Sequence, residues 1–154
     1  MRIPIRTVGV AALAIVVTHE PVRAQESALQ SAIRSFGPDM SLPDEATLVV
    51  RDDFNGDGHE DVAAVVRGPD RSALVVFHGT TQGYEMHPLY TRLPQGDVQL
   101  RVVPSGRQAV VGNASGVQLA HPGIELIFPG RSSAMYVWES GRYQVYGTES
   151  FYAR

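Results

Sequence analysis

The chain contains 154 residues, carries a formal net charge of −3 and has no cysteine. This length fits a single domain with its own core, and the lack of cysteine excludes disulfides, thiolate zinc sites and cysteine nucleophiles. All thirteen basic residues are arginine, and they are scattered along the sequence without the cluster that a row of phosphates would need. We therefore expect no nucleic-acid partner.

Residues 1–24 are predicted to be a signal peptide. Arg2 and Arg6 give a positive start, residues 8–17 form an apolar run, and the segment ends in a Val-Arg-Ala triplet typical of a cleavage site. The run has about ten residues, whereas a helix that crosses a membrane needs roughly 20. We expect cleavage after Ala24, a periplasmic or secreted location and no membrane span afterwards. The main alternative is an uncleaved N-terminal anchor.

Residues 25–154 are predicted to form a single β-rich domain that begins with a helix. Leu29, Ala32, Ile33 and Phe36 recur at the spacing of one helical face, and a Gly-Pro pair follows them. After this helix, short runs of β-branched and aromatic residues alternate with turn residues, which indicates strands. The expected strands are 47–51, 62–67, 73–78, 83–90, 98–103, 109–111, 117–120, 124–128, 134–139 and 143–147.

The spacing of these runs determines the predicted fold class. The strands follow one another at intervals of about ten residues, and no later segment has the length and period of a connecting helix. We therefore expect a mainly β (α+β) fold, with an antiparallel sheet of about 8–10 short strands that form a meander and one N-terminal helix.

Aromatic residues gather in the last hairpin, 134–147, which turns at Ser140-Gly141. Its large side chains are Tyr136, Trp138, Tyr143 and Tyr146. Because aromatic residues are common in strands, we interpret them as ordinary cross-strand packing. The alternative is an exposed aromatic face in an interaction or inhibitor-like module, whose partner would be an unidentified envelope or extracellular protein.

The segment 53–61 places oxygen donors at the spacing of a calcium loop. Counted from Asp53 as position 1, side-chain oxygens fall at positions 1, 3, 5 and 9, and a main-chain carbonyl falls at position 7. The predicted ligands are Asp53, Asn55, Asp57, the backbone carbonyl of His59 and Asp61. Calcium takes about six to eight oxygen ligands, and Gly58 at position 6 permits the sharp turn around the ion. The alternative is an acidic, glycine-rich surface turn.

Two further features favour calcium and define the type of site. Three carboxylates within nine residues repel one another unless a cation lies between them. Position 12 is Ala64, inside an apolar run that is typical of a strand, whereas a helix-loop-helix calcium site has a bidentate glutamate there. The loop is therefore predicted to join two strands.

The segment from Leu48 to Val66 resembles the FG-GAP (VCBS-like) repeat, in which such a loop joins two antiparallel strands of a propeller blade. The resemblance implies that calcium is bound by Asp53, Asn55, Asp57, the carbonyl of His59 and Asp61. It covers about twenty residues and occurs once, as in some small exported bacterial proteins. Because a propeller needs several blades, we expect no complete propeller.

The leading hypothesis is a non-enzymatic, exported domain in which calcium stabilises the hairpin around residues 53–61. One alternative is the interaction module described above. Another is a hydrolase whose site is assembled from residues far apart in the sequence. His59, His78, His87 and His121 show no catalytic or metal-binding spacing, and His78 and His121 are expected at the edges of turns. We therefore predict no catalytic residue.

Overall fold

The computed structural model describes residues 20–94 and 96–148. Its helices are α1 (Glu20–Phe36) and the 3-10 helix η1 (Ala46–Leu48), and its strands are β1 (Val49–Asp52), β2 (Asp61–Arg67), β3 (Ser72–Thr80), β4 (Gly83–Tyr90), β5 (Gln99–Val103), β6 (Gly106–Val110), β7 (Asn113–Leu119), β8 (Gly123–Ile127), β9 (Ser133–Glu139) and β10 (Arg142–Thr148). Each strand expected from the sequence is present, with ends that differ by a few residues.

Helix α1 is longer than the sequence pattern predicted. It begins at Glu20, and its last turn ends where the N–H of Gly37 donates to the carbonyl of Ile33 at 3.1 Å. The predicted cleavage point after Ala24 falls within α1, while residues 1–19 of the predicted signal peptide lie outside the described residues. None of the helices described here is long and apolar enough to cross a membrane.

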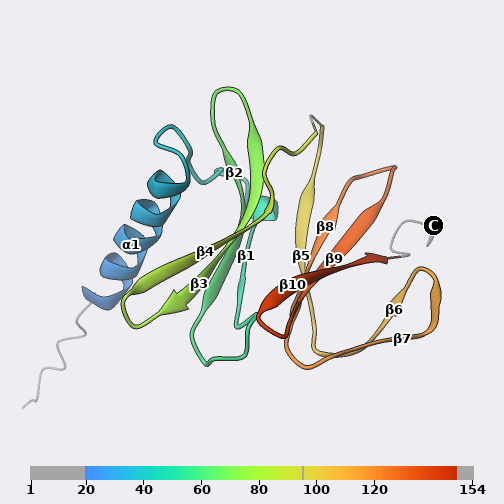
Figure 1. The fold of residues 1–154 in the computed structure, drawn as a ribbon. Helices are drawn as coiled ribbons and strands as arrows, with labels where there is room; N and C mark the ends of the chain where they lie inside the picture. The colour runs from blue at the N-terminus through green and yellow to red at the C-terminus, as the bar shows by residue number, and fades with distance from the viewer. Residues whose placement is uncertain (1–19, 95, 149–154) are drawn as a thin grey trace, which may run out of the picture.

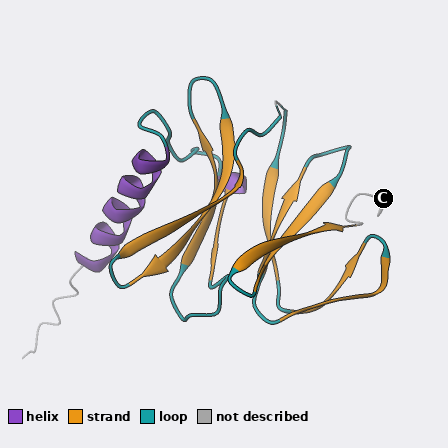
Figure 2. Ribbon diagram, in the orientation of Figure 1, coloured by secondary structure: helices purple, strands orange, loops and turns teal. Residues whose placement is uncertain are grey.

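The strands form two four-stranded sheets and a two-stranded ribbon, and every pairing is antiparallel (Figures 1 and 2). Sheet A has the order β1-β2-β3-β4, a simple meander. Sheet B has the order β10-β9-β8-β5, because the β6-β7 ribbon is inserted between β5 and β8. The predicted mainly β, antiparallel fold with one N-terminal helix is confirmed, and its strands divide between these sheets instead of forming one.

Sheet A is covered on both faces. One set of alternating residues in β2 and β3 packs toward sheet B, in a core of Leu48, Phe54, Ala63, Val65, Leu74, Val76, Leu93, Leu100, Ile124, Leu126 and Tyr136. The other set packs against α1, in a core that includes Leu29, Ile33, Val62, Ala64, Val66, Val75 and Phe77. Because β2 and β3 are buried on both faces, their sequences are continuous apolar runs rather than alternating ones.

The β6-β7 ribbon covers part of the second face of sheet B. It contributes Val110 and Leu119 to a third core, in which they pack with Val103, Met135 and Val137. In Figure 1, α1, sheet A, sheet B and the β6-β7 ribbon lie side by side in this order from left to right. The β1-β2 loop lies at the lower edge of the two sheets in this view, beside the turn between β7 and β8.

Candidate metal centre

The predicted calcium loop connects β1 to β2, and the strand ladder stops at the pair Asp52 and Asp61. Its second residue, Phe54, is completely buried in the core between the two sheets. Residues 56–60 are exposed. The loop is therefore fixed at its base by an aromatic anchor and presents its glycine-rich half to solvent.

The backbone of the loop curls around the carboxylate of Asp53. Oδ1 of Asp53 accepts hydrogen bonds from the N–H groups of Gly56 at 2.7 Å and Asp57 at 3.1 Å, and Oδ2 accepts one from Gly58 at 2.9 Å. Gly56 and Gly58 have φ angles of 75° and 85°, in the left-handed region that glycine enters without steric cost. The two glycines thus allow the chain to double back over position 1.

Asn55 and Asp57 hold the exposed half of the loop together. The N–H of Asp57 donates to Oδ1 of Asn55 at 3.0 Å, and Nδ2 of Asn55 donates back to Oδ2 of Asp57 at 3.0 Å. The N–H of His59 donates to Oδ1 of Asp57 at 2.8 Å. That backbone hydrogen bond is the main reason that the pKa of Asp57 is lowered. Its carboxylate is therefore held in the charged form that a cation requires.

Asp61 differs from the other acidic residues because it is completely buried. Its Oδ2 accepts the N–H of Phe54 at 2.9 Å, and its Oδ1 accepts the N–H of Gly79, in β3, at 2.8 Å. A Cβ on Gly79 would lie 2.3 Å from the carbonyl oxygen of Glu60, so only glycine permits this approach. Burial is the main cause that raises the pKa of Asp61 to about 6, and the charge of Asp57 contributes. Asp61 therefore ties the loop to β3.

The donor chemistry of the loop fits a hard cation. The side-chain acceptors at the predicted ligand positions are all oxygens. Each carboxylate has about four lone-pair positions. Backbone hydrogen bonds use three of them at Asp53, two at Asp61 and one at Asp57. Within residues 20–94 and 96–148, no group of three or more histidine or acidic side chains is gathered into a metal-binding cluster. Asn55 and the carbonyl of His59 would therefore be needed beside the carboxylates.

A histidine that the sequence analysis did not connect with the loop packs over it. A Cβ on Gly56 would lie 2.0 Å from Cε1 of His121, so the imidazole ring occupies the space above this glycine. His121 lies between β7 and β8, at the edge of a turn as predicted. Because residue 121 is far from residue 56 in sequence, only the packing of sheet B beside sheet A brings them together.

The prediction for His78 was wrong. His78 does not end a strand, since β3 continues to Thr80, and its side chain is buried. Its ring lies 4.3 Å from the ring of His87, 4.6 Å from that of Trp138 and 5.6 Å from that of Tyr143, measured between centroids. Nε2 of His78 is 2.7 Å from the hydroxyl of Tyr143. These four rings, the inter-sheet aromatic cluster, join β3 and β4 to β9 and β10.

The same contacts explain the role of the last hairpin. It has the predicted turn, with Ser140 and Gly141 at φ angles of 50° and 81°. Tyr136 is 5% exposed within the core between the sheets, and Trp138 and Tyr143 belong to the inter-sheet aromatic cluster. These three aromatic side chains are thus engaged in packing within the domain.

The inter-sheet aromatic cluster predicts a pH-dependent stability. Burial, followed by repulsion from His87, lowers the pKa of His78 to about 4, although Asp57 and Asp53 act in the opposite direction. An unfolded histidine titrates near pH 6.5. Below that pH, protons bind the unfolded chain more readily than the folded one, so the free energy of unfolding decreases as the pH falls from about 6.5 toward 4. Between pH 7 and 4.5 this amounts to about 2 kcal/mol.

This pH dependence can be measured by urea unfolding of the wild type and of His78→Gln, which cannot titrate. The raised pKa of Asp61 acts with the opposite sign, because the stability from protonated Asp61 is lost as the pH rises through 6. Only the difference between the two proteins therefore isolates His78. We expect the wild type to lose more stability on acidification than the variant, and His59→Gln, at an exposed site, to behave like the wild type. Equal losses in the wild type and His78→Gln would refute this assignment.

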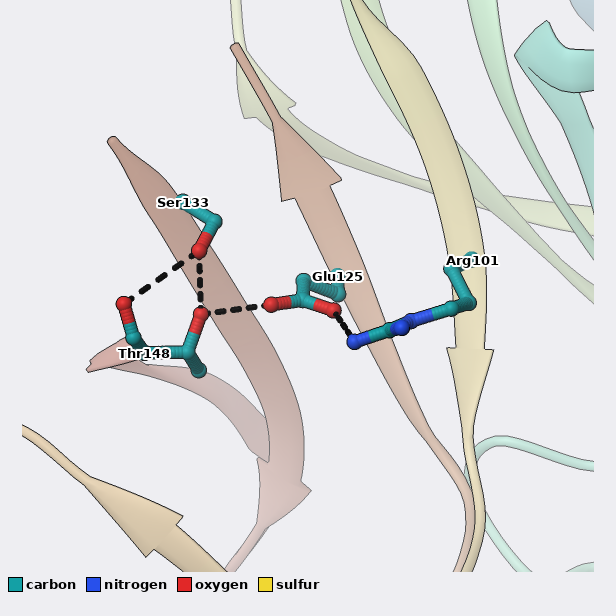
Figure 3. A network of polar contacts seen from close by, with 4 residues as sticks. All are labelled: Arg101, Glu125, Ser133 and Thr148. Atoms are coloured by element: carbon teal, nitrogen blue, oxygen red, sulfur yellow. Dashed lines mark hydrogen bonds and ion pairs between the residues drawn. The ribbon is translucent and has the colours of Figure 1, made fainter. Parts of the chain in front are cut away.

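A second polar network lies on sheet B, on the face that the β6-β7 ribbon partly covers (Figure 3). Glu125 is 1% exposed, yet it pairs with Arg101 of the neighbouring strand and accepts a hydrogen bond from the hydroxyl of Thr148 at 2.5 Å. Ser133 also contacts the Thr148 hydroxyl. A buried carboxylate requires such partners, because its desolvation is costly without them. The network thus fixes β5, β8, β9 and β10 to one another.

Comparison of the chain with protein-family profiles, with curated proteins and with solved structures found no match. The resemblance of the loop to the FG-GAP repeat therefore stays a prediction from its sequence.

Proposed function

We propose that this protein is a non-enzymatic, exported domain in which calcium binds the β1-β2 loop and stabilises the hairpin. The observation that carries the proposal is the curled backbone of the loop, in which three successive N–H groups donate to the carboxylate of Asp53. The curl supports the proposal because it brings the backbone of positions 4 to 6 over Asp53, the first predicted ligand. The residues that would hold the ion are Asp53, Asn55, Asp57, His59 through its carbonyl, and Asp61.

The charge of the loop supports the same proposal. Asp53, Asp57 and Asp61 carry three carboxylates on one hairpin, and Asp57 contributes to the raised pKa of Asp61. A bound cation would remove this repulsion and favour the charged form of each carboxylate. Because Asp61 also accepts the N–H of Gly79, the ion would stabilise the contact between the hairpin and β3 as well as the hairpin itself.

An exported location fits a weak site of this kind. Extracellular calcium modules bind with dissociation constants of about 10⁻⁴ to 10⁻³ M, so millimolar calcium would add roughly 0.5–1.5 kcal/mol to the free energy of unfolding. The ion would then add to a stability that comes mainly from the three apolar cores of the domain, one of which includes Phe54 of the loop.

Thermal unfolding with millimolar calcium or with a chelator tests the proposal. We expect calcium to raise the midpoint of the wild type by a few degrees and to leave that of Asp57→Ala unchanged. The matched control is Glu60→Gln, because Glu60 is an exposed neighbour that pairs with Arg51 at 3.3 Å and is not a predicted ligand. This variant should keep the calcium response. If wild type and Asp57→Ala respond alike, the loop is not the site.

A further inference from the structure

A wide cleft lies at the other end of β2 from the calcium loop. It is formed by the turn between β2 and β3 and by the segment that follows β4, and its volume is about 780 Å³. The hollow beside the calcium loop has about 380 Å³. The N–H of Leu93 donates to the carbonyl of Ser72 at 2.8 Å, which joins the two walls, and Leu93 is buried. The cleft therefore has a fixed floor.

Three arginines line this cleft, which we call the arginine cleft. They are Arg67, Arg71 and Arg92, and Asp70 is the acidic residue among the lining side chains. The chain as a whole has a net charge of −3, so this concentration of positive charge runs against its overall charge. Arg67 and Arg71 lie on either side of the turn between β2 and β3, and Arg92 follows β4. The fold brings the three to one site because the ends of β2, β3 and β4 are neighbours in sheet A.

The three arginines differ in the contacts that they make within the protein. Arg67 forms an ion pair with Glu45 at 2.8 Å, and the guanidinium of Arg71 lies 5.3 Å from the centre of the Phe36 ring. Within the described part of the chain, no carboxylate pairs with Arg71 or Arg92. Arg71 and Arg92 are both exposed residues that line the cleft. An arginine guanidinium can form paired N–H bonds to a carboxylate or phosphate.

An aromatic ring and apolar groups complete the cleft. Tyr90 is 42% exposed, which is unusual for the large apolar side chains of this protein, and it lines the cleft together with Leu93 and Val98. An exposed tyrosine offers a flat apolar face and a polar hydroxyl group at once. Asp70 can accept hydrogen bonds from ligand hydroxyl groups. These features together favour an organic anion with a ring and hydroxyl groups over a bare inorganic ion.

We propose that the arginine cleft binds an acidic saccharide, one that carries a carboxylate or a phosphate group. Arg92 would hold the anionic group, and the sugar ring would lie against Tyr90. The β2 strand separates the cleft from Asp61 by roughly 20 Å, since Arg67 at the cleft lies six positions after Asp61 at about 3.3 Å per residue. Binding in the cleft therefore does not require calcium.

Calorimetric titration of the full chain with trigalacturonate, glucose 6-phosphate and neutral glucose tests this proposal and distinguishes the two anionic groups. We expect at least one anionic probe to bind and glucose not to bind. Arg92→Gln should weaken that binding about tenfold or more, because it removes a charge-assisted contact. Arg107→Gln is the matched control, since Arg107 lies in β6, outside the cleft, and it should bind like the wild type.

Three results would overturn the proposal. They are no binding of either anionic probe at millimolar concentration, unchanged binding by Arg92→Gln, and equal weakening by Arg107→Gln. Arg71→Gln is a less suitable first variant, because Arg71 also contacts Phe36 at the end of α1. Repeating the titration with a chelator and with Asp57→Ala keeps this test separate from the calcium proposal, and binding should persist in both.

Discussion

Replacing Phe54 by alanine is expected to lower the free energy of unfolding by about 3–5 kcal/mol, as for other buried aromatic side chains. Phe54 has no exposed surface and is part of the core between the two sheets. Alanine would leave a cavity there, while the neighbouring Asp53 and Asn55 would lose the anchor that fixes the base of the loop. The change should therefore also weaken calcium binding, although Phe54 offers no side-chain ligand.

Urea unfolding of wild type, Phe54→Ala and Phe54→Leu measures this effect, with a chelator present so that the ion does not contribute. Leucine fills most of the same volume, so its loss should be clearly smaller than that of alanine. Calcium titration of Phe54→Leu should then give an affinity closer to that of the wild type. A loss below about 1 kcal/mol for Phe54→Ala would contradict the anchoring role, because a buried phenylalanine normally contributes more.

Replacing Asp61 by alanine is expected to cost about 2–4 kcal/mol even without calcium, because the N–H groups of Phe54 and Gly79 would lose their acceptors in a buried site. Part of this loss is offset, since the raised pKa of Asp61 means that folding disfavours its charged form at pH 7. Asp61→Asn keeps one acceptor oxygen and removes the charge, so its loss should be smaller.

Chemical unfolding at pH 7 in the presence of a chelator measures both Asp61 variants. Added calcium should then stabilise the wild type but neither variant. If Asp61→Ala unfolds at the same urea concentration as the wild type, the two hydrogen bonds do not join the loop to β3 as described. If Asp61→Ala is destabilised but still responds fully to calcium, Asp61 has a structural role and is not a ligand.

The local structure of this protein could be predicted from its sequence because local patterns determine it. β-branched and aromatic runs separated by turn residues identified all ten strands, and Ser140-Gly141 identified the last turn. The alternating oxygen donors of residues 53–61 identified the loop, and the glycines take the left-handed conformations that its curl needs. Each of these features depends on residues that lie within about ten positions of one another.

Features that depend on the packing of distant strands could not be predicted in this way. His78 and His87 contact Trp138 and Tyr143 because two sheets face each other, and no spacing in the sequence indicates that contact. The same is true of His121 above Gly56. The division into two sheets also escaped prediction, because strand order depends on where the β6-β7 ribbon is inserted.

The arginine cleft shows a further limit of sequence analysis. Arg67, Arg71 and Arg92 form no basic run in the sequence, and the scatter of the arginines predicted only that a long run of phosphate contacts is absent, which stays a prediction. They meet because a turn and a loop lie at the same edge of sheet A. In Figure 1, the turn between β2 and β3 lies at the upper edge of the sheets, and the β1-β2 loop lies at the lower edge.

Calcium titration followed through the backbone amide signals in NMR spectra tests the central claim most directly, because it reports both affinity and location. In chelator-treated wild-type protein, the signals of residues 53–61 should shift along one saturable curve, with a dissociation constant of about 10⁻⁴ to 10⁻³ M. Glu60→Gln should give the same curve, and Asp57→Ala should give none. Unchanged loop signals at millimolar calcium, or equal shifts in Asp57→Ala, would contradict a calcium site in this loop.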